Sequence, residues 1–518
     1  MFESLRAQNL ARDRNYPELM RLSEHYYAEK TDCESLRDLA NTLLGSGLNS
    51  QAAQLYKKAY ELDPKNLASL IGFANSLKDI LHQEEALRIY RFLHEQLPEN
   101  FLIWRNLLLA MEYANFVTDQ ERFEYAKRWG QWQQQQAIIS NAQEKLARTD
   151  ESELRVGYLS ADLCQHTVGL FLRGLLKAHT KKITAYTYHI GQLSDGVTNE
   201  ISQFSRLRSC SHMSDKEIIE QIQTDQLHIL IDLSGHTAGS RLHLLANRLA
   251  AVQLSWLGYF ATTGLPNLEG IVLDTWHISQ ENQGFFTEPI TLLKSGRLCY
   301  QPMEFCPLIS DTPHKKNGFI TFGSFNNTAK YNLAVLKLWS KILHEVPDSR
   351  LIMKWRTFHD PVFCDRVAKI FQDEGIDPRR LDFRGFSTHD QMLAEYADID
   401  IALDPFPFSG GLTSCEALWM GVPVITMPQS RAVSRQTYAF LSTIGGLNDL
   451  IAKDAGDYLS LATRWASDGA KLKHFRLQIR EQMSASPLMD INSFAAEFED
   501  MLSHQLVQKT GNAQKSDA

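Results

Sequence analysis

The sequence predicts a helical N-terminal region followed by two doubly wound α/β domains. Before residue 101 a pattern of helical character repeats, and after residue 150 two series of short apolar runs alternate with helical segments. Helical patterns at a fixed period indicate repeat arrays, and strands alternating with helices indicate parallel sheets. At 518 residues the chain is too long for one hydrophobic core, so several domains are expected.

Composition is that of an ordinary globular protein, with 44% hydrophobic and 22% charged residues. The net charge of −8 gives no reason to expect nucleic-acid binding. No apolar run reaches transmembrane length, and the N-terminus lacks the apolar core of a signal peptide. The seven cysteines form no Cys-x-x-Cys pair, so neither a disulfide framework nor a structural zinc site is expected. These features predict a cytoplasmic protein.

The repeat lies within residues 1–149 and is clearest at 33–100. Small residues where helices cross, an aromatic in the second helix and a closing proline form the tetratricopeptide pattern. The matching pairs are 34 residues apart: Ala40 and Ala74, Ala52 and Ala86, Tyr56 and Tyr90, Pro64 and Pro98, Asn66 and Asn100. A degenerate unit begins at Phe101. Such an array is either a groove for protein partners or a structural brace, and the sequence favours neither.

A connecting helix and linker are expected from Asp119 to about Glu151, with a domain boundary near Thr149. The first α/β domain then covers residues 150–305. Its predicted strands are Leu154–Ser160, Ile183–Ile190, Leu227–Leu233, Val252–Tyr259 and Ile271–Asp274. Its predicted helices lie near Gly169–Ala178, Asp215–Thr224 and Arg241–Leu249.

The second α/β domain covers residues 306–508, after a proline-containing linker at Gln301–Asn317. Its predicted strands are Phe319–Phe325, Arg350–Trp355, Leu381–Gly385, Ile399–Asp404 and Val422–Met427. Its predicted helices lie near Leu333–His344, Pro361–Glu374, His389–Tyr396, Thr413–Met420 and Ala432–Leu441, and residues Tyr458 to Gln508 are mostly helical. The polar tail, 509–518, is expected to be disordered.

The most informative stretch is Asp404–Pro423, where an apolar strand is followed by a Pro- and Gly-rich turn and a helix predicted to open at Thr413. Backbone N–H groups at such a helix start favour a phosphate, and Gly410 and Gly411 let the main chain come close. Glu416, one turn into the helix, is placed to reach a ribose hydroxyl. A strand, turn and helix without any ligand is the alternative interpretation.

Polar residues and glycines also follow the other predicted strands. Ligands of doubly wound sheets bind outside the carboxyl ends of the strands, so two such domains predict a site in a cleft. The loops concerned are Ser160–His166, Asp232–Thr237, Tyr259–Gly264 and Ser324–Lys330.

In this order, the loops resemble those of the O-linked N-acetylglucosamine transferase family, in particular its bacterial SPINDLY-type members. The resemblance covers roughly Leu154 to Leu502. The residues that carry it are Arg155–Asp162 with His166, Asp232–Thr237, Gln253–Tyr259, Phe322–Asn327 with Lys330, Ala402–Pro423, and Ser434-Arg435. It implies a GT-B-type fold, in which two Rossmann-like domains face a cleft behind a tetratricopeptide array.

The resemblance implies an inverting enzyme that moves a sugar from a UDP-sugar, here N-acetylglucosamine, to Ser or Thr hydroxyls of proteins. The UDP-sugar is a co-substrate, and neither a cofactor nor a metal is expected. Lys330 matches the phosphate-binding lysine and Asn327 an amide near the diphosphate. Glu416 matches the ribose-binding position, and Gly410, Gly411 and Thr413 form the helix start that receives the phosphates.

On the acceptor side, His166 matches a family histidine and is the candidate general base, because imidazole titrates near neutral pH. Asp162, Asp232 and His236 are expected to orient the acceptor or shape the cleft. His228 coincides with another family histidine, although its position at the start of a strand equally suits a structural role.

Three departures from the family pattern affect sugar choice and acceptor geometry more than the fold. Gly411-Leu412-Thr413 replaces His-Thr-Thr, Met392 stands where a uracil-contacting His is common, and Phe260-Ala261 replaces Pro-Gly. Asp398-Ile399-Asp400 spells the Asp-x-Asp of metal-dependent transferases, but it enters a buried strand, so we do not assign it to a metal.

Two alternatives stay open: a protein N-glucosyltransferase acting on Asn, and an inactive scaffold whose repeats bind partners. Protein acceptors, held in part by the repeats, are the expected partners. The sequence gives no prediction of oligomeric state.

Overall fold

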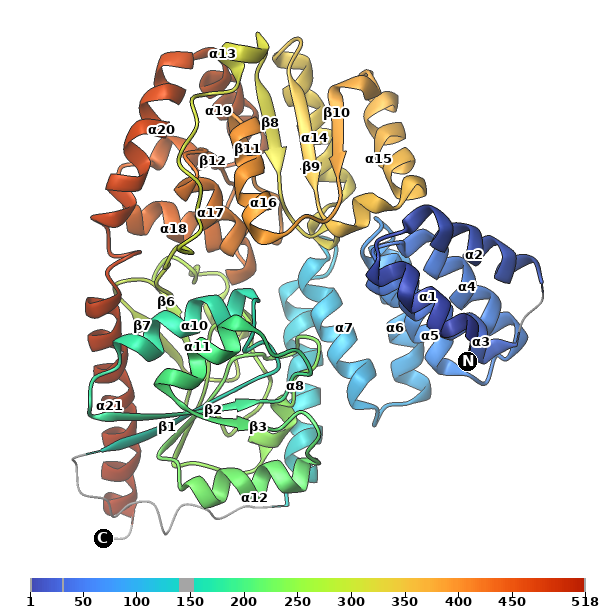
Figure 1. The fold of residues 1–518 in the computed structure, drawn as a ribbon. Helices are drawn as coiled ribbons and strands as arrows, with labels where there is room; N and C mark the ends of the chain where they lie inside the picture. Colours follow the sequence, from blue (N-terminus) through green and yellow to red (C-terminus); the bar gives the residue numbers. More distant parts are fainter. Residues whose placement is uncertain (1, 30–31, 139–152, 517–518) are drawn as a thin grey trace. The chain divides into compact units, whose positions relative to one another are not determined.

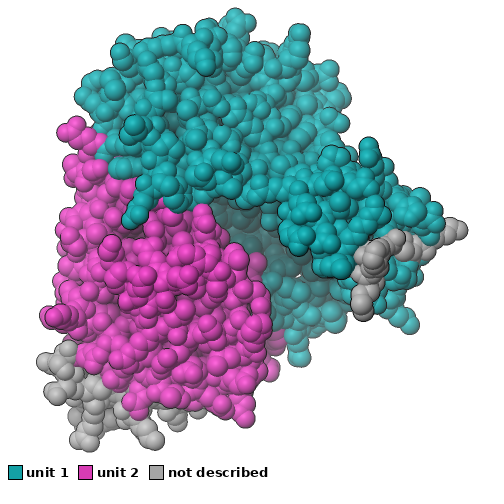
Figure 2. Space-filling model, viewed as in Figure 1, with its two compact units in different colours: residues 1–116, 304–428, 449–480 teal, residues 117–303, 429–448, 481–518 magenta. Residues whose placement is uncertain are grey.

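The computed structural model describes residues 2–29, 32–138 and 153–516. The chain forms two units (Figure 2). Unit 1 comprises residues 1–116, 304–428 and 449–480, and unit 2 comprises residues 117–303, 429–448 and 481–518. The helical repeats and the second α/β sheet therefore belong to one unit, although they are far apart in the sequence.

The N-terminal part of unit 1 consists of helix pairs, as the repeat predicted (Figure 1). The four repeated alanines, Ala40, Ala52, Ala74 and Ala86, are buried where helices cross. Tyr56 donates a hydrogen bond to Asn41 and Tyr90 donates one to Asn75, each at 2.5 Å. The helices are α1 (Phe2–Arg12), α2 (Tyr16–Ala28), α3 (Cys33–Gly45), α4 (Asn49–Leu62), α5 (Leu67–Lys78), α6 (Gln83–Gln96) and α7 (Phe101–Tyr113).

Unit 1 also holds a five-stranded parallel sheet in the order β10-β9-β8-β11-β12. Its strands are β8 (Thr321–Ser324), β9 (Arg350–Lys354), β10 (Leu381–Arg384), β11 (Ile401–Leu403) and β12 (Val424–Ile425). Its helices are α13 (His314–Asn317), α14 (Leu333–Glu345), α15 (Pro361–Asp373), α16 (His389–Glu395), α17 (Leu412–Trp419) and α19 (Ala455–Ser467). Because β9 and β10 lie on one side of β8 and β11 on the other, the chain reverses direction across the sheet between β8 and β11.

Direct contacts join the repeats to this sheet. The Ser50 N–H donates to the Asp360 carboxylate at 2.7 Å, and the rings of Tyr16 and His359 stack with centroids 4.2 Å apart. Burial raises the pKa of Asp360, and hydrogen bonds from the Ser50, Val362 and Phe363 N–H groups oppose that shift. The repeats are thus packed against the second α/β sheet.

Unit 2 is built on a seven-stranded parallel sheet in the order β3-β2-β1-β4-β5-β6-β7. Its reversal point lies between β1 and β4. The strands are β1 (Leu154–Ser160), β2 (Ile183–His189), β3 (Arg206–Ser209), β4 (Ile229–Asp232), β5 (Val252–Ser255), β6 (Gly270–Asp274) and β7 (Ile290–Leu293). The helices of this unit are α8 (Asp119–Gln136), α10 (Thr167–Ala178), α11 (Gly196–Phe204), α12 (Asp215–Asp225), α18 (Gln436–Ile444) and α21 (Ile491–Ser516), while α20 (Gly469–Ser484) crosses the boundary between the units.

Helix α8 packs main chain to main chain on the loop after β5. A Cβ on Gly130 would lie 1.7 Å from the Gly264 carbonyl oxygen, and a Cβ on Gly264 would lie 1.9 Å from the Ala126 carbonyl oxygen. Only glycine allows this approach. The Trp129 ring, fully buried on the same helix, meets the edge of the His236 ring at 4.4 Å.

The structure corrects several predicted elements. Strands β3 and β7, both at sheet edges, were not predicted, and most predicted strands were too long at one or both ends. The segment near Arg241–Leu249 is a short 3₁₀ helix, Leu242–Ala246, and α17 begins at Leu412 rather than Thr413. Helix α21 continues to Ser516, into the tail predicted to be disordered. The boundary predicted near Thr149 lies outside the described residues.

No helix in the described residues combines the length and the apolar character needed to cross a membrane.

Candidate functional site

Each sheet presents polar loops at its reversal point, at the carboxyl ends of the strands. In unit 1 these are the segment after β8, which carries Lys330, and the segment after β11, which leads into α17. In unit 2 they are the loops after β1 and β4, which are joined by a 3.0 Å hydrogen bond between the Ser160 and Ser234 hydroxyls. Because ligands of doubly wound sheets bind at such points, each unit has one candidate half-site.

Lys330 is the centre of the half-site in unit 1. It ends a 3₁₀ turn, Thr328–Lys330, and its Nζ donates to the Ser409 carbonyl at 2.8 Å and to the Asn326 side chain at 3.2 Å. The ammonium lies 4.9 Å from the centre of the Phe408 ring. Burial lowers the pKa of Lys330 to about 8, and the nearby Asp404 carboxylate opposes that shift. The structure therefore holds a partly desolvated cation beside the loop before α17.

Asn326 links this lysine to α17. Its side-chain oxygen accepts from Lys330 and, at 3.5 Å, from the Thr413 hydroxyl. Asn327, the residue predicted to present an amide near the diphosphate, accepts the Ala329 N–H at 3.0 Å with its side-chain oxygen and so caps the 3₁₀ turn. The sequence places two asparagines side by side, and only the structure distinguishes the one that contacts Lys330 from the one that caps its turn.

The glycine loop is tightly constrained. The Gly410 N–H donates to the Asp404 carboxylate at 2.6 Å, and a Cβ at this position would lie 2.1 Å from the Ser414 hydroxyl. Gly410, predicted to let the main chain approach the phosphates, thus donates its own N–H to a side chain of the same loop. Gly411 precedes the first residue of α17, and no side chain in the described part of the chain caps this helix. The Ser414 N–H donates to the Gly411 carbonyl at 3.0 Å, and the partial positive charge at the start of the helix suits an anion.

Glu416 lies on α17 and is buried. Its carboxylate is 2.5 Å from Nε2 of His389, the first residue of α16. Burial raises the pKa of Glu416, and the hydrogen bond and charge of His389 oppose that shift. The structure makes His389 the partner of Glu416.

A cavity of about 10 Å³ lies between the carboxyl ends of β8 and β11 and the start of α17. Ser324, Asn326, Asp404 and Thr413 line part of it. Its size is that of a single water molecule. The residues gathered around Lys330 are therefore closely packed.

In unit 2, Asp162 and His166 belong to the loop after β1. His166 precedes α10, its side chain is half exposed, and its Nδ1 lies 3.8 Å from an Asp162 carboxylate oxygen. The Val168 N–H donates to the same Nδ1 at 3.4 Å, so the His166 side chain caps the start of α10. Burial raises the pKa of Asp162, while His166 and His189 oppose that shift.

Asp232 is the last residue of β4 and is 1% exposed. One carboxylate oxygen accepts the N–H groups of Ser234 at 3.2 Å and Gly235 at 2.6 Å. The other, Oδ1, has no hydrogen-bond partner among the described residues. Burial raises the pKa of Asp232 to about 7, against the effect of the two N–H groups. The polar group that the sequence placed at the end of this strand is therefore a buried carboxyl group.

Two predicted acceptor-side residues have structural contacts. The His236 ring is buried between Trp129 and Tyr259, and its Nε2 is 2.9 Å from the Thr263 carbonyl. His228 precedes β4, at the amino end of the strand, and its Nδ1 accepts the Arg155 N–H at 2.9 Å. Burial lowers the pKa of His228 to about 4. Asp232 lies at the opposite, carboxyl end of β4, so His228 lies away from the half-site.

The Asp-x-Asp sequence is engaged elsewhere. Asp398 pairs with Arg384 at 2.7 Å, whereas the buried Asp400 accepts from the Thr321 N–H at 2.9 Å and contacts the His314 ring at 2.9 Å. No group of three or more His, Cys, Asp or Glu residues arranged for a metal ion occurs in the described ranges.

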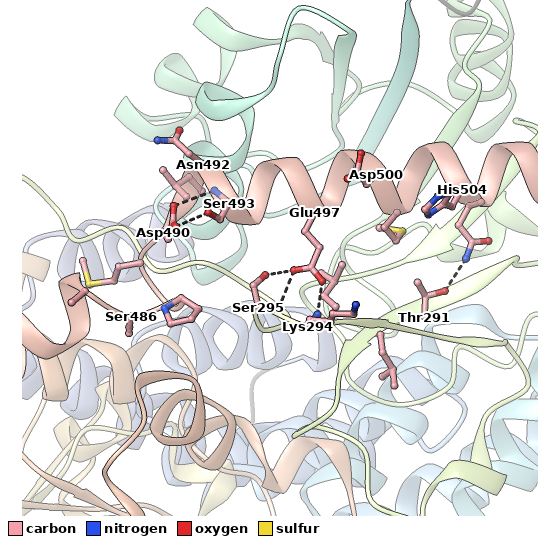
Figure 3. Close-up of a pocket in the computed structure, with 18 of the residues that line it drawn as sticks. Thr291, Lys294, Ser295, Ser486, Asp490, Asn492, Ser493, Glu497, Asp500 and His504 are labelled. Carbon is pink, nitrogen blue, oxygen red and sulfur yellow. Dashed lines mark hydrogen bonds between the residues drawn. The ribbon is translucent and has the colours of Figure 1, made fainter.

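A larger groove, of about 1140 Å³, lies in unit 2 beside β7 and α21 (Figure 3). Polar and apolar side chains line it together, and the Glu497 carboxylate accepts the N–H groups of Lys294 at 2.5 Å and Ser295 at 3.0 Å. None of the predicted site residues lines this groove.

The half-site in unit 1 offers a cation and a helix start, which suit phosphates, whereas the half-site in unit 2 offers carboxyl groups and an imidazole, which suit proton transfer and hydroxyl binding. The sequence profile of glycosyl transferase family 41 matches residues 93–299 and 312–498.

The SPINDLY protein of Petunia hybrida, named as a probable UDP-N-acetylglucosamine–peptide N-acetylglucosaminyltransferase, is 34% identical over 412 residues, or 78% of this chain and 44% of the relative. The SPINDLY protein of Arabidopsis thaliana, with the same name, is 33% identical over 414 residues, with the same two coverages. The chain spans less than half the length of these relatives.

The solved structure of an O-GlcNAc transferase mutant from Thermobaculum terrenum has a TM-score of 0.88 to this chain, at 28% identity and with 98% of each chain covered. The fold predicted from sequence, a helical region before two parallel-sheet α/β domains, is confirmed. With the family profile matched over most of its length, the chain belongs to glycosyl transferase family 41.

Proposed function

We propose that this chain is an inverting, metal-independent glycosyltransferase that moves N-acetylglucosamine from UDP-N-acetylglucosamine to Ser or Thr hydroxyls of proteins. Family membership and the names of the relatives support the donor and the peptide acceptor. The observation that carries the proposal is the cluster of Lys330, Asn326 and Thr413 at the uncapped start of α17.

This cluster suits the departure of UDP. When the bond to the sugar breaks, the diphosphate gains negative charge, and preorganised donors lower the energy of that transition state. The Lys330 ammonium is held by two hydrogen bonds, so it is already oriented before the substrate arrives. The first N–H groups of α17 add partial positive charge. Glu416, with His389 beside it, is our candidate for binding the ribose.

On the acceptor side we assign His166 to the hydroxyl. Its side chain is half exposed. With the ring hydrogen on Nδ1, toward the Asp162 carboxylate, Nε2 carries no hydrogen and can accept a hydrogen bond from the acceptor hydroxyl. As the oxygen attacks the anomeric carbon, its proton moves to Nε2 and the bond from that carbon to the UDP oxygen breaks. The Asp162 carboxylate, 3.8 Å from Nδ1, stabilises the imidazolium.

The proposal needs no metal, because the charge on the leaving group is met by Lys330 and α17. The two carboxylates of the Asp-x-Asp sequence already have partners. We also propose that the helical repeats contribute to acceptor binding. The protein would act in the cytoplasm, in agreement with its seven cysteines, which form no disulfide.

The test is calorimetric titration of UDP, without added metal, into the wild type and Lys330→Ala. Lys337→Ala is the matched control, because Lys337 lies on α14 with a half-exposed side chain and pairs with Glu374. We expect a loss of affinity of at least tenfold in Lys330→Ala, about 1.4 kcal/mol, and none in the control. Equal affinity in all three proteins contradicts the assignment of Lys330.

A second arm measures transfer from radiolabelled UDP-N-acetylglucosamine to acceptor peptides, and fragmentation mass spectrometry locates the sugar. A sugar on Ser or Thr supports the proposal. A sugar on Asn supports N-glycosyl transfer instead, and a wild type that binds no UDP supports an inactive scaffold.

A further inference from the structure

The helical repeats contact the Lys330 segment directly. Gln83, the first residue of α6, donates from its side-chain amide to the Tyr331 carbonyl at 2.7 Å and to the Ala329 carbonyl at 3.4 Å. These are the two main-chain neighbours of Lys330. One glutamine of the repeats therefore holds the backbone on both sides of the lysine.

A second contact reaches the ammonium through two aromatic rings. Tyr113, the last residue of α7, stacks on Phe408 with centroids 4.7 Å apart and ring planes 15° from parallel. The Lys330 ammonium lies 4.9 Å from the centre of the same Phe408 ring. The Lys78 ammonium, at the end of α5, is 5.2 Å from the centre of the Tyr113 ring. Four side chains thus form one stack from α5 to the glycine loop.

This stack bears on how Lys330 is held. A lysine side chain has four rotatable bonds, so fixing its ammonium in one place costs conformational entropy. The Phe408 ring attracts the ammonium and shields it from water, but Phe408 lies in a loop. Tyr113 supports that ring from a helix of the repeat array, which is a more rigid element.

We propose that Gln83 and Tyr113 are positioning residues of the nucleotide site, so that the helical repeats complete the site that holds Lys330. The inference rests on the proposed function for the identity of the ligand, but the positioning of Lys330 is measurable without any ligand. Gln83 fixes the main chain of the segment, and Tyr113 fixes the Phe408 ring on which the ammonium rests.

The first measurement is the pH profile of Lys330 acylation, read by peptide mass spectrometry in the full chain. In the wild type the profile should report the lowered pKa of Lys330, about 8. In Tyr113→Leu, which has no aromatic face, Phe408 loses its support and water reaches the ammonium, so the pKa should rise toward its ordinary value. Tyr113→Phe keeps the ring and should match the wild type. Gln83→Leu should shift the profile in the same direction as Tyr113→Leu.

Tyr56→Leu is the structural control. Tyr56 is a fully buried tyrosine of the repeats with no contact to Phe408 among those the structure gives. Its loss should lower thermal stability but leave the Lys330 profile unchanged. A shift as large in Tyr56→Leu as in Tyr113→Leu would mean general loosening of the repeats and would overturn the proposal.

The second measurement is affinity for UDP and for uridine. Since Lys330 is assigned to the phosphates, Tyr113→Leu should weaken UDP binding about fivefold and leave uridine binding unchanged. An unchanged Lys330 profile together with unchanged UDP affinity refutes the positioning role. A wild type that binds no UDP, with a profile still shifted by Tyr113→Leu, refutes the proposed function and supports the positioning role.

Discussion

In both sheets the strand order reverses at an equivalent point, between β8 and β11 in unit 1 and between β1 and β4 in unit 2. The side chains gathered at these two reversal points nevertheless differ in the sign of their charge. In unit 1 the loops present the Lys330 ammonium and the uncapped start of α17. In unit 2 they present the carboxyl groups of Asp162 and Asp232 and the His166 imidazole. The strand order determines where the loops gather. The residues of those loops determine whether a reversal point suits phosphate binding or proton transfer.

Burial acts on both points, and in each it favours the neutral form. It lowers the pKa of Lys330 to about 8 and raises the pKa of Asp232 to about 7. Both groups therefore titrate closer to neutral pH than their types do in water. Such perturbed groups are typical of functional sites.

The largest difference between the two points should appear in transfer kinetics. Lys330→Ala removes a charge that stabilises the leaving group, so turnover should fall about 1000-fold, together with the loss of UDP affinity. The measurement is steady-state transfer at saturating donor. A turnover within tenfold of the wild type contradicts the electrostatic role of the lysine.

His166→Ala tests the other point. Turnover should fall about 100-fold, the usual effect of losing a general acid or base, while UDP affinity in the calorimeter stays within about twofold of the wild type. If UDP affinity falls as much as in Lys330→Ala, then His166 contributes to donor binding, and the proposed separation of donor binding in unit 1 from acceptor activation in unit 2 is wrong.

Asp232→Asn should change how stability depends on pH. An unfolded chain holds the carboxyl at its ordinary pKa of about 3.9, whereas burial raises the pKa of the folded group to about 7. The group therefore stabilises the fold fully below about pH 4, and that contribution is lost as the pH rises through about 7.

Asparagine cannot ionise and can still accept the two N–H groups. The free energy of unfolding of the variant, relative to that of the wild type, should therefore rise by on the order of 2 kcal/mol between pH 5 and pH 8. Urea unfolding of both proteins at the two pH values measures this. A constant difference between them would show that Asp232 does not titrate in this range.

The smallest effect should come from chelation. If Lys330 and α17 meet the charge of the leaving group, transfer in excess EDTA should stay within about twofold of the untreated rate. Restoring Mg²⁺ or Mn²⁺ to a treated sample is the control. A rate that disappears with EDTA and returns with the metal contradicts the division of charge between the two points.

Much of the fold was predictable because alternating apolar runs are a strong local signal. The predicted strand Leu154–Ser160 was matched at both ends. The missed strands β3 and β7 are short and lie at the edges of the sheet, where partial exposure weakens the apolar pattern. The strand predicted at Val422–Met427 has only two residues, Val424 and Ile425, because only these pair with β11.

The candidate site was predictable to the level of loops but not of atoms. Position after a strand selected the segments of Lys330 and Asp232, and the structure places both at the carboxyl ends of strands. The identity of each residue's partner, in contrast, depends on contacts distant in sequence. His236 is enclosed by Trp129 from a helix more than a hundred residues earlier. Gln83 and Tyr113 carry no local signal that relates them to Lys330.

The close approach of α8 to the loop after β5 bears on where this chain can be cut. A chain shortened to begin at residue 150 would keep every strand of the seven-stranded sheet but lose the helix that Gly130 and Gly264 bring into contact. Trp129 would be gone, and the buried His236 ring beneath it would face solvent. Residue 117, where unit 2 begins, is the better starting point for a shortened chain that keeps α8 packed on this sheet.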